Sequence, residues 1–465
     1  MKSKIRIILT VLLFVYLGGG CLMEPPISPS PTRLASTLAP VSTLSTTPSH
    51  TPFSATPTPT GKPSPTQPSP TPTPAQSAIQ PCIRDGIPET PPSGFGFPGG
   101  IAFWNFEILA YSLVGGQPLV IREFSTSDEE YTVPIGFSPN GEWLAYLSGS
   151  PYDPPMQLHL MSFDGNNKIT FLIKENELLD YSSPYTAVGA WAWSGWLNNK
   201  LIYVHLSNPS ENELTRTVFS LLDAFTGEWL PDPLAQLPER TERGGVVFSP
   251  DLSRVLYAAG EPNQIYDTTL VLYDLENQAA VWQQENFRGD HFNSNFGGAT
   301  NVSAAWAPDS SLLAYTGPET TNENIPPVSQ QGLFLLDRDG LQSRLLTNFF
   351  GQYDSSSAKY PTWSPDSKYL AFVVYQYNQG DEVARIGLYV YDITVSQLVE
   401  VCPIYGDIFD KLVWSPDSRY LAYTAEQEDR AWPYPLVVID LLTGSVFEVA
   451  EDARSLGGWS EKFQP

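Results

Sequence analysis

Histidine and cysteine, the residue types that most often bind metals or take part in catalysis, are sparse in this chain. Of its four His, three lie in the C-terminal two thirds, at His159, His205 and His291, in separate segments without ligand spacing. The sequence has no Cys-x-x-Cys pair, no Gly-x-Ser-x-Gly turn and no Asp-x-Asp-x-Asp-Gly loop. We therefore expect no catalytic residue, no metal site and no cofactor, and a chain that is not an enzyme.

The amino terminus has the composition of an export signal. Three cations within the first six residues precede an apolar stretch at 7–17, about half of the ~20 residues that cross a bilayer as a helix. The glycines at 18–20 then lead to Cys21. This pattern resembles a bacterial lipoprotein signal, which implies that residues 1–21 are the signal and that Cys21 becomes the lipidated N-terminus. An ordinary secretory signal is the alternative, and either signal exports the mature protein.

A segment rich in Pro, Thr and Ser follows the signal. It has no helical or strand periodicity and too little apolar surface to offset the entropy of ordering. Its prolines favour extended polyproline II, and the 57 residues at 25–81 would reach on the order of 170 Å at ~3.1 Å per residue. Residues 22–81 are therefore predicted to be a stalk, and residues 82–465 the folded domain.

The predicted folded domain is strongly acidic. The whole chain has 25 basic and 50 acidic residues, a net charge of -25. Five basic residues and one acidic residue precede Cys82, which leaves 20 basic and 49 acidic residues in the domain, a net charge of -29. This charge would repel a phosphate backbone, so nucleic acid is excluded as an expected partner.

An internal repeat organises the domain. Its anchor, an aromatic residue followed by Ser or Ala and then Pro, occurs five times: FSPNGEWLAY from Phe137, FSPDLSRVLY from Phe248, WAPDSSLLAY from Trp306, WSPDSKYLAF from Trp363 and WSPDSRYLAY from Trp414. Weaker copies lie around Trp193 and Trp459, and successive anchors are 45 to 58 residues apart. A period near 50 is typical of propeller blades.

Each repeat is predicted to form four short strands. The anchor ends the first strand, a Ser-Pro-Asp-Ser tight turn leads into the second, and the third ends in Asp, as in LYVYD at Asp392. The pattern resembles the WD-type repeat of TolB-like β-propellers, which also occurs in propeller domains attached to prolyl-oligopeptidase-type serine hydrolases. The resemblance implies an all-β propeller of four-stranded antiparallel blades, in which the repeated Trp and Asp residues are structural.

The ends of the domain predict how the ring closes. Six complete repeats span 133–451, and they leave three apolar segments within 99–125 and one strand around Trp459. Three strands and one strand make a seventh blade, whose pairing removes exposed sheet edges. We therefore expect Trp459 in the innermost strand of a closing blade. Six blades, with both ends as excursions, is the alternative.

The two ends of the blades are predicted to differ. The turns from first to second and from third to fourth strand share one end, the turn face, and are short and uniform. The remaining connections form the loop face and are long and variable, which is typical of recognition surfaces. Tyr, Trp and Arg dominate interface hot spots. The candidate binding residues on the loop face are Tyr152, Tyr181, Phe287, Arg288, His291, Phe292, Tyr353, Tyr375, Tyr377, Arg430, Trp432 and Tyr434. Packing of the loops is the alternative role for each.

The two cysteines that remain once Cys21 carries lipid are Cys82, at the end of the stalk, and Cys402, at the exit of a blade. We expect them to pair, because exported proteins meet an oxidising compartment.

The function expected from these features is that of a non-catalytic binding module at the cell envelope. It would be anchored to the membrane by its N-terminal lipid, at the cell surface or in the periplasm. The propeller would be monomeric and would bind a protein, peptide or glycan. The alternatives are a propeller-fold enzyme that processes glycans or peptides, and a structural component of the envelope.

Overall fold

The computed structural model of this chain describes residues 76–92, 95–104, 110–112, 131–149, 157–162, 166–172, 195–208, 216–230, 237, 246–259, 268–287, 304–318, 330–347, 355–377, 383–404, 408, 411–424, 434–453 and 455–462. Within these residues the fold is all-β, apart from one 3-10 turn, η1 (Ile83–Gly86). None of the described residues forms a helix long and apolar enough to cross a membrane.

Hydrogen bonds join the strands into six sheets. The sheet that contains both ends of the domain has β2 (Ala110–Ser112), β1 (Gly100–Trp104) and β26 (Ser455–Ser460). The second sheet has β3 (Tyr131–Phe137), β4 (Trp143–Gly149), β5 (Gln157–Ser162) and β6 (Lys168–Leu172). The third has β7 (Gly195–Trp196), β8 (Leu201–Asn208) and β9 (Arg216–Asp223). The fourth has β10 (Val246–Phe248), β11 (Arg254–Ala259), β12 (Thr268–Asp274) and β13 (Ala279–Phe287).

The remaining two sheets hold three repeats. One has β14 (Ala304–Trp306), β15 (Leu312–Pro318), β16 (Gln330–Asp337), β17 (Ser343–Leu345), β18 (Ser355–Trp363), β19 (Tyr369–Tyr377), β20 (Val383–Asp392) and β21 (Gln397–Ile404). The other has β22 (Val413–Trp414), β23 (Tyr420–Thr424), β24 (Tyr434–Asp440) and β25 (Ser445–Ala453).

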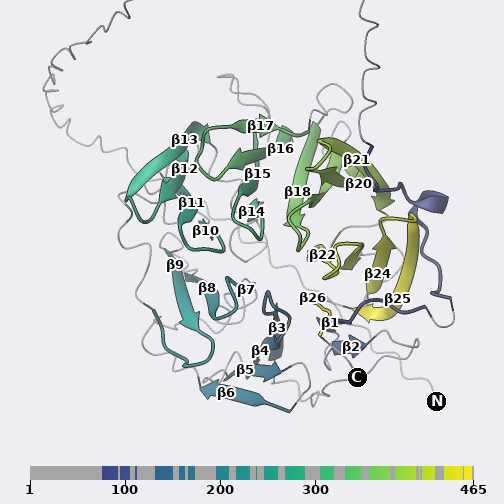
Figure 1. The fold of residues 1–465 in the computed structure, drawn as a ribbon, viewed down its shortest axis with the longest axis horizontal. Coiled ribbons are helices and arrows are strands. Elements are labelled where there is room, and N and C mark those ends of the chain that lie inside the picture. The colour runs from purple at the N-terminus through teal and green to yellow at the C-terminus, as the bar shows by residue number, and fades with distance from the viewer. Residues whose placement is uncertain are drawn as a thin grey trace, which may run out of the picture. The chain divides into compact units, whose positions relative to one another are not determined.

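The sheets are arranged as a β-propeller, with the first strand of each repeat innermost (Figure 1). The structure therefore has six blades, which is the alternative count, and the expected count of seven is corrected. The eight-stranded sheet contains two successive repeats, β14–β17 and β18–β21, because β16 pairs in parallel with β18 over two residues. The described residues therefore hold seven repeat units in six sheets.

Neighbouring repeats are joined by the indole groups of the anchor tryptophans. Trp363 donates its indole N–H to the carbonyl of Ala305 at 2.8 Å, and Trp414 donates to Thr362 at 3.1 Å. Each acceptor directly precedes the anchor of the preceding repeat. Because both rings are also buried, the repeated Trp is a structural residue.

Replacement of Trp363 with Phe is expected to lower the free energy of unfolding by about 1 kcal/mol, because a net hydrogen bond is worth roughly 0.5–1.5 kcal/mol. Trp282→Phe is the matched control, since this outer-strand indole has no hydrogen bond within the described part of the chain. Chemical denaturation of both variants measures the difference. Equal losses in the two variants would contradict a role for the indole N–H.

The turns of adjacent repeats are also connected. Their serines adopt φ near 60°, a left-handed conformation that turns the hydroxyl toward the preceding repeat. These hydroxyls accept hydrogen bonds from backbone N–H groups at 3.2–3.3 Å. Ser310 accepts from Asp251, Ser367 from Asp309 and Ser418 from Asp366. The uniform sequence of the turn face thus follows from its role in holding the ring together.

Three aspartates that end third strands, Asp223, Asp274 and Asp440, are buried and paired with a cation. Asp440 accepts a bidentate pair of hydrogen bonds from the Arg419 guanidinium, at 3.0 and 2.6 Å. Burial raises the pKa of Asp440, but the hydrogen bonds and charge of Arg419 outweigh burial and hold this pKa below its ordinary value of 3.8. Burial also raises the pKa values of Asp223 and Asp274. For each of them, hydrogen bonds together with the charge of a nearby cation outweigh burial and lower the pKa.

Lowered pKa values in the folded state predict acid sensitivity. The stability contributed by these carboxylates is complete above their unfolded pKa near 4 and is lost as pH falls through the lower folded pKa. We expect the free energy of unfolding to fall from about pH 5 to about pH 3, and Asp440→Asn to reduce that slope. Urea titrations at each pH measure it. An unchanged slope in the variant would contradict the assignment.

Three of the four strands predicted for the closing sheet are described, and they pair with one another. β26 pairs antiparallel with β1, with Trp459 opposite Ile101, and β1 pairs with β2. The Trp459 indole donates to the carbonyl of Pro98 at 2.6 Å, and its ring stacks on Tyr420 at 6.0 Å between centroids. The expected innermost position of Trp459 is confirmed. The third predicted segment, 117–124, lies outside the described residues.

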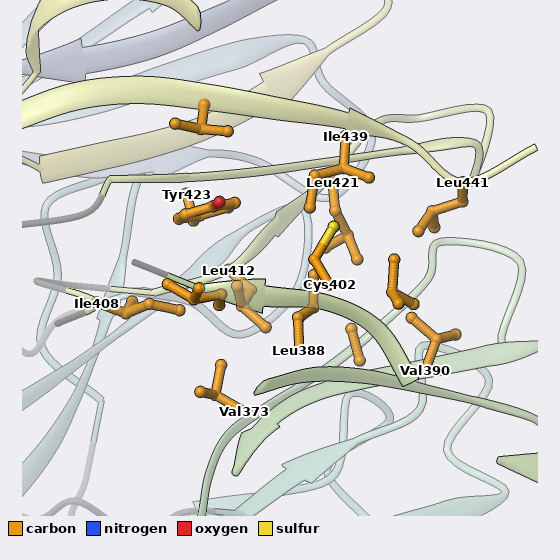
Figure 2. Packing of buried hydrophobic residues seen from close by; sticks show 14 of the residues in the cluster. Val373, Leu388, Val390, Cys402, Ile408, Leu412, Leu421, Tyr423, Ile439 and Leu441 are labelled. Atoms are coloured by element: carbon orange, nitrogen blue, oxygen red, sulfur yellow. The ribbon is translucent and has the colours of Figure 1, made fainter. Parts of the chain in front are cut away.

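Residues 76–92 form a strap across two repeats, β18–β21 and β22–β25. A disulfide joins Cys82 to Cys402 of β21, with Cα atoms 5.2 Å apart. Ile79 is buried in the apolar cluster between the two repeats, and Figure 2 shows Cys402 there beside Leu388 and Leu421. Structured residues therefore begin at least six positions before the predicted domain boundary at Cys82.

Candidate binding face

Most of the predicted binding residues lie outside the described part of the chain. These are Tyr152, Tyr181, Arg288, His291, Phe292, Tyr353, Arg430 and Trp432, and Cys21 lies outside it as well. Phe287 ends β13 and Tyr434 begins β24, and only their backbone is described. The candidate face is therefore built on Tyr375 and Tyr377.

Tyr375 and Tyr377 lie in a strand, which corrects their expected position in a loop. β19 continues through both residues because β18 and β20 are equally long here: Ser357 pairs with Tyr375, and Val383 pairs with Tyr377. Tyr375 is only 2% exposed and belongs to the apolar cluster between β18–β21 and β22–β25. Its main role is packing, whereas Tyr377 is partly buried at the tip of the strand.

The two tyrosines form a short aromatic ladder with a lysine. Their rings are stacked, with centroids 6.5 Å apart, and the Lys359 ammonium lies 4.3 Å from the centre of the Tyr375 ring. A cation over a ring face is attracted by the ring quadrupole. This Lys359–Tyr375–Tyr377 ladder runs from the middle of β18 to the loop end of β19, so it brings a positive charge close to aromatic rings near the loop face of an acidic domain.

The backbone beside the ladder is unusual. Tyr360 has a φ of 56°, at the register shift between Lys359 and Thr362 in β18. A bulky residue in the left-handed region is disfavoured by about 1–3 kcal/mol and persists where surrounding structure fixes it. On the opposite side of β19, the Gln376 side-chain carbonyl is buried with no hydrogen-bond partner in the described residues. Neither the left-handed backbone of Tyr360 nor the buried Gln376 carbonyl can be predicted from the sequence.

The histidine that the structure describes with its side chain is a packed residue. His159 is buried, its Nε2 and Nδ1 atoms lie 2.6 and 3.0 Å from the Ser148 and Thr170 hydroxyls, and its ring stacks on Tyr146. No group of three or more His, Cys, Asp or Glu side chains that could hold a metal is found among the described residues.

The strap contacts the turn face. Ser77 donates its hydroxyl hydrogen to Asp392 at 2.8 Å, and the backbone N–H groups of Gln80 and Ile83 donate to Leu441 and Gly444 at 2.8 and 2.9 Å. These acceptors lie in the turns β20–β21 and β24–β25, which connect third to fourth strands. The strap therefore lies at the end of the propeller opposite the loop face.

Comparison with known proteins gives distant relatives. No family model matches the chain. It is 23% identical over 158 residues to dipeptidyl-peptidase 5 of Porphyromonas gingivalis, a match to 34% of this chain and 22% of that enzyme. The chain thus aligns with about a fifth of the length of this curated relative.

Similar solved structures include TolB-like and other β-propellers. TolB of Acinetobacter baumannii is 14% identical, with a TM-score of 0.37 and 72% of this chain and 68% of that chain covered. An oligogalacturonate lyase in complex with manganese is 13% identical, with a TM-score of 0.45 and coverage of 77% and 86%. The propeller domain of the Trilobed protease of Pyrococcus furiosus is 13% identical, with a TM-score of 0.40 and coverage of 70% and 84%.

These comparisons correct the expectation that the chain is not an enzyme. The finding that overturns it is the sequence match to a peptidase, which covers 34% of this chain. The expectation depended on the absence of short sequence motifs, and such an absence does not exclude catalysis.

Proposed function

We propose that this chain is a cell-envelope lipoprotein whose propeller binds a protein, peptide or glycan through its loop face. The Lys359–Tyr375–Tyr377 ladder carries the proposal, because it is the described part of the loop face in which a cation and aromatic rings come together. Tyr377 is its accessible end, and an aromatic ring that becomes buried at an interface is a typical hot spot.

The position of the strap supports the same function. A tether that enters at the turn face leaves the loop face pointing away from the point of attachment. In this proposal Cys21 carries the lipid, the segment between Cys21 and the strap spans the distance to the membrane, and the loop face meets ligands in the surrounding space.

The proposed anchor is tested by metabolic labelling with a palmitate analogue. Expression of the full chain should give a labelled protein in the membrane fraction, and Cys21→Ser should remove both the label and the membrane association. A labelled Cys21→Ser protein, or an unlabelled wild type, would contradict lipidation at this residue.

The proposed binding face is tested with peptide and glycan arrays, followed by titration of the tightest-binding probe. Tyr377→Ala should weaken binding at least about 30-fold, because truncating a hot-spot aromatic typically costs about 2 kcal/mol or more. Asp366→Ala, on the turn face, is the matched control and should lower stability while leaving affinity unchanged. Weaker binding by Asp366→Ala together with unchanged binding by Tyr377→Ala would overturn the assignment.

A peptide-processing enzyme is the second candidate function. The observation that favours it is the sequence match to dipeptidyl-peptidase 5, although the match covers only 22% of that enzyme. Incubation of the purified chain with a library of N-terminally free peptides, followed by mass spectrometry, tests it. Release of dipeptides would support this candidate, and intact peptides would rule it out for the library used.

A further inference from the structure

The two ends of the domain are attached to the ring in different ways. At the N-terminal end, Cys82 is bonded covalently to β21 and donates its backbone N–H to Val401 at 2.6 Å. At the C-terminal end, β26 is held by its pairing with β1 and by packing such as that of Trp459 on Tyr420. Only the N-terminal end therefore has a covalent attachment among the described residues.

The closing strand follows the strap closely. β1 begins at Gly100, 18 residues after Cys82 in the sequence, and it is the strand through which β26 joins the ring. Without the disulfide, tension on the N-terminus would first remove the strap contacts of Gln80, Ile83 and Glu89, and would then act on β1. Each backbone hydrogen bond contributes little net stability, so they would break one after another.

We propose that the Cys82–Cys402 disulfide is the point at which tension on the N-terminal tether enters the propeller, so that the closing sheet is bypassed. Force that reaches Cys82 passes through the disulfide into β21. This strand is paired with β20 over seven residues and lies against the apolar cluster shared with β22–β25 (Figure 2). Residues 83–104 then carry no tension, and the ring stays closed while the tether is pulled.

The burial of Cys402 agrees with this role. Its side chain is 1% exposed, among Leu388, Val401 and Leu421. Ile79 packs into the same cluster from the strap side, and Ser77 is hydrogen-bonded to Asp392. The covalent attachment is therefore made in the packed interior between two repeats, where displacement of one strand is resisted by both.

Single-molecule pulling tests this inference on the full chain with Cys21→Ser. One handle is attached to the N-terminus and the other to a ligation tag inserted in the connection between β6 and β7. The oxidised protein should show no extension attributable to residues 83–104 before the main unfolding event. Reduction with a phosphine, or Cys82→Ser with Cys402→Ala, should add an earlier step at lower force, on the order of 70 Å for 22 residues at ~3.3 Å each.

Pulling from the C-terminus against the same tag is the matched control. Force then acts on β26 directly, so the first step should be the same with and without the disulfide. An identical first step in oxidised and reduced protein pulled from the N-terminus would overturn the inference. If the double variant does not fold, reduction of the wild-type disulfide during pulling gives the same comparison.

The inference rests on the proposed function only in taking the N-terminus as the tethered end. The handles apply force directly, so failure of the pulling experiment leaves the lipid anchor untouched. Failure of the labelling experiment with Cys21→Ser would likewise leave the path of tension through Cys82 intact.

Discussion

Loss of the Cys82–Cys402 disulfide is expected to lower the free energy of unfolding by about 5 kcal/mol. The two cysteines are 320 residues apart in sequence, and the chain-entropy model gives a value of this size for a loop so long, mainly by restricting the unfolded state. Denaturant titration of Cys82→Ser with Cys402→Ala against the oxidised wild type measures the loss.

Reduction provides the control for this prediction. Treatment with a phosphine should destabilise the wild type to the level of the double variant and should leave the double variant itself unchanged. Equal stability of oxidised and reduced wild type would contradict a stabilising role for the disulfide.

Replacement of Trp459 with Ala is expected to cost about 4 kcal/mol, because truncation of a buried Trp removes its packing and leaves a cavity. The ring contacts Tyr420 and Phe97 at the junction of the closing sheet with β22–β25. Thermal or denaturant unfolding measures the effect. The lost packing is that of β26, the strand that completes the ring.

Two control variants test whether the loss in the free energy of unfolding comes from the packing that closes the ring. Trp459→Phe keeps most of the ring and loses the indole hydrogen bond to Pro98, so it should cost only about 1 kcal/mol. Leu341→Ala, at an 81% exposed position, should change stability by less than about 0.5 kcal/mol. A Trp459→Ala protein as stable as Leu341→Ala would contradict the closure described here.

The fold could be predicted because its determinants are local and repeated. The anchor aromatic, the Ser-Pro-Asp turn and the Asp that ends the third strand each appear in several copies, so the period identifies the blade. The closing sheet was also predictable, since the end fragments have the same pattern as a complete blade. The parallel pairing of Gln330 and Gln331 with β18 could not be predicted, because it depends on how closely two repeats approach each other.

The strap and the candidate face were less accessible from sequence. Ser77 and Ile79 lie in a Pro- and Ser-rich segment, and their burial depends on a single contact site between two repeats, which composition does not encode. The sequence predicts a loop at Tyr375 because the apolar run of the strand ends just before it. Pairing with β18 and β20 extends that strand through Tyr377, so one predicted contact residue is a core residue.

The loop face is the proposed functional surface of the propeller, and hydrogen exchange tests this directly. The full chain would be compared with and without the tightest-binding probe from the peptide and glycan arrays. Protection should fall at the loop end of β18–β20, around Lys359 and Tyr377, and in the long connections between repeats. Protection confined to the turns that contain Ser364–Asp366 and Ser415–Asp417, with the loop end unchanged, would contradict it.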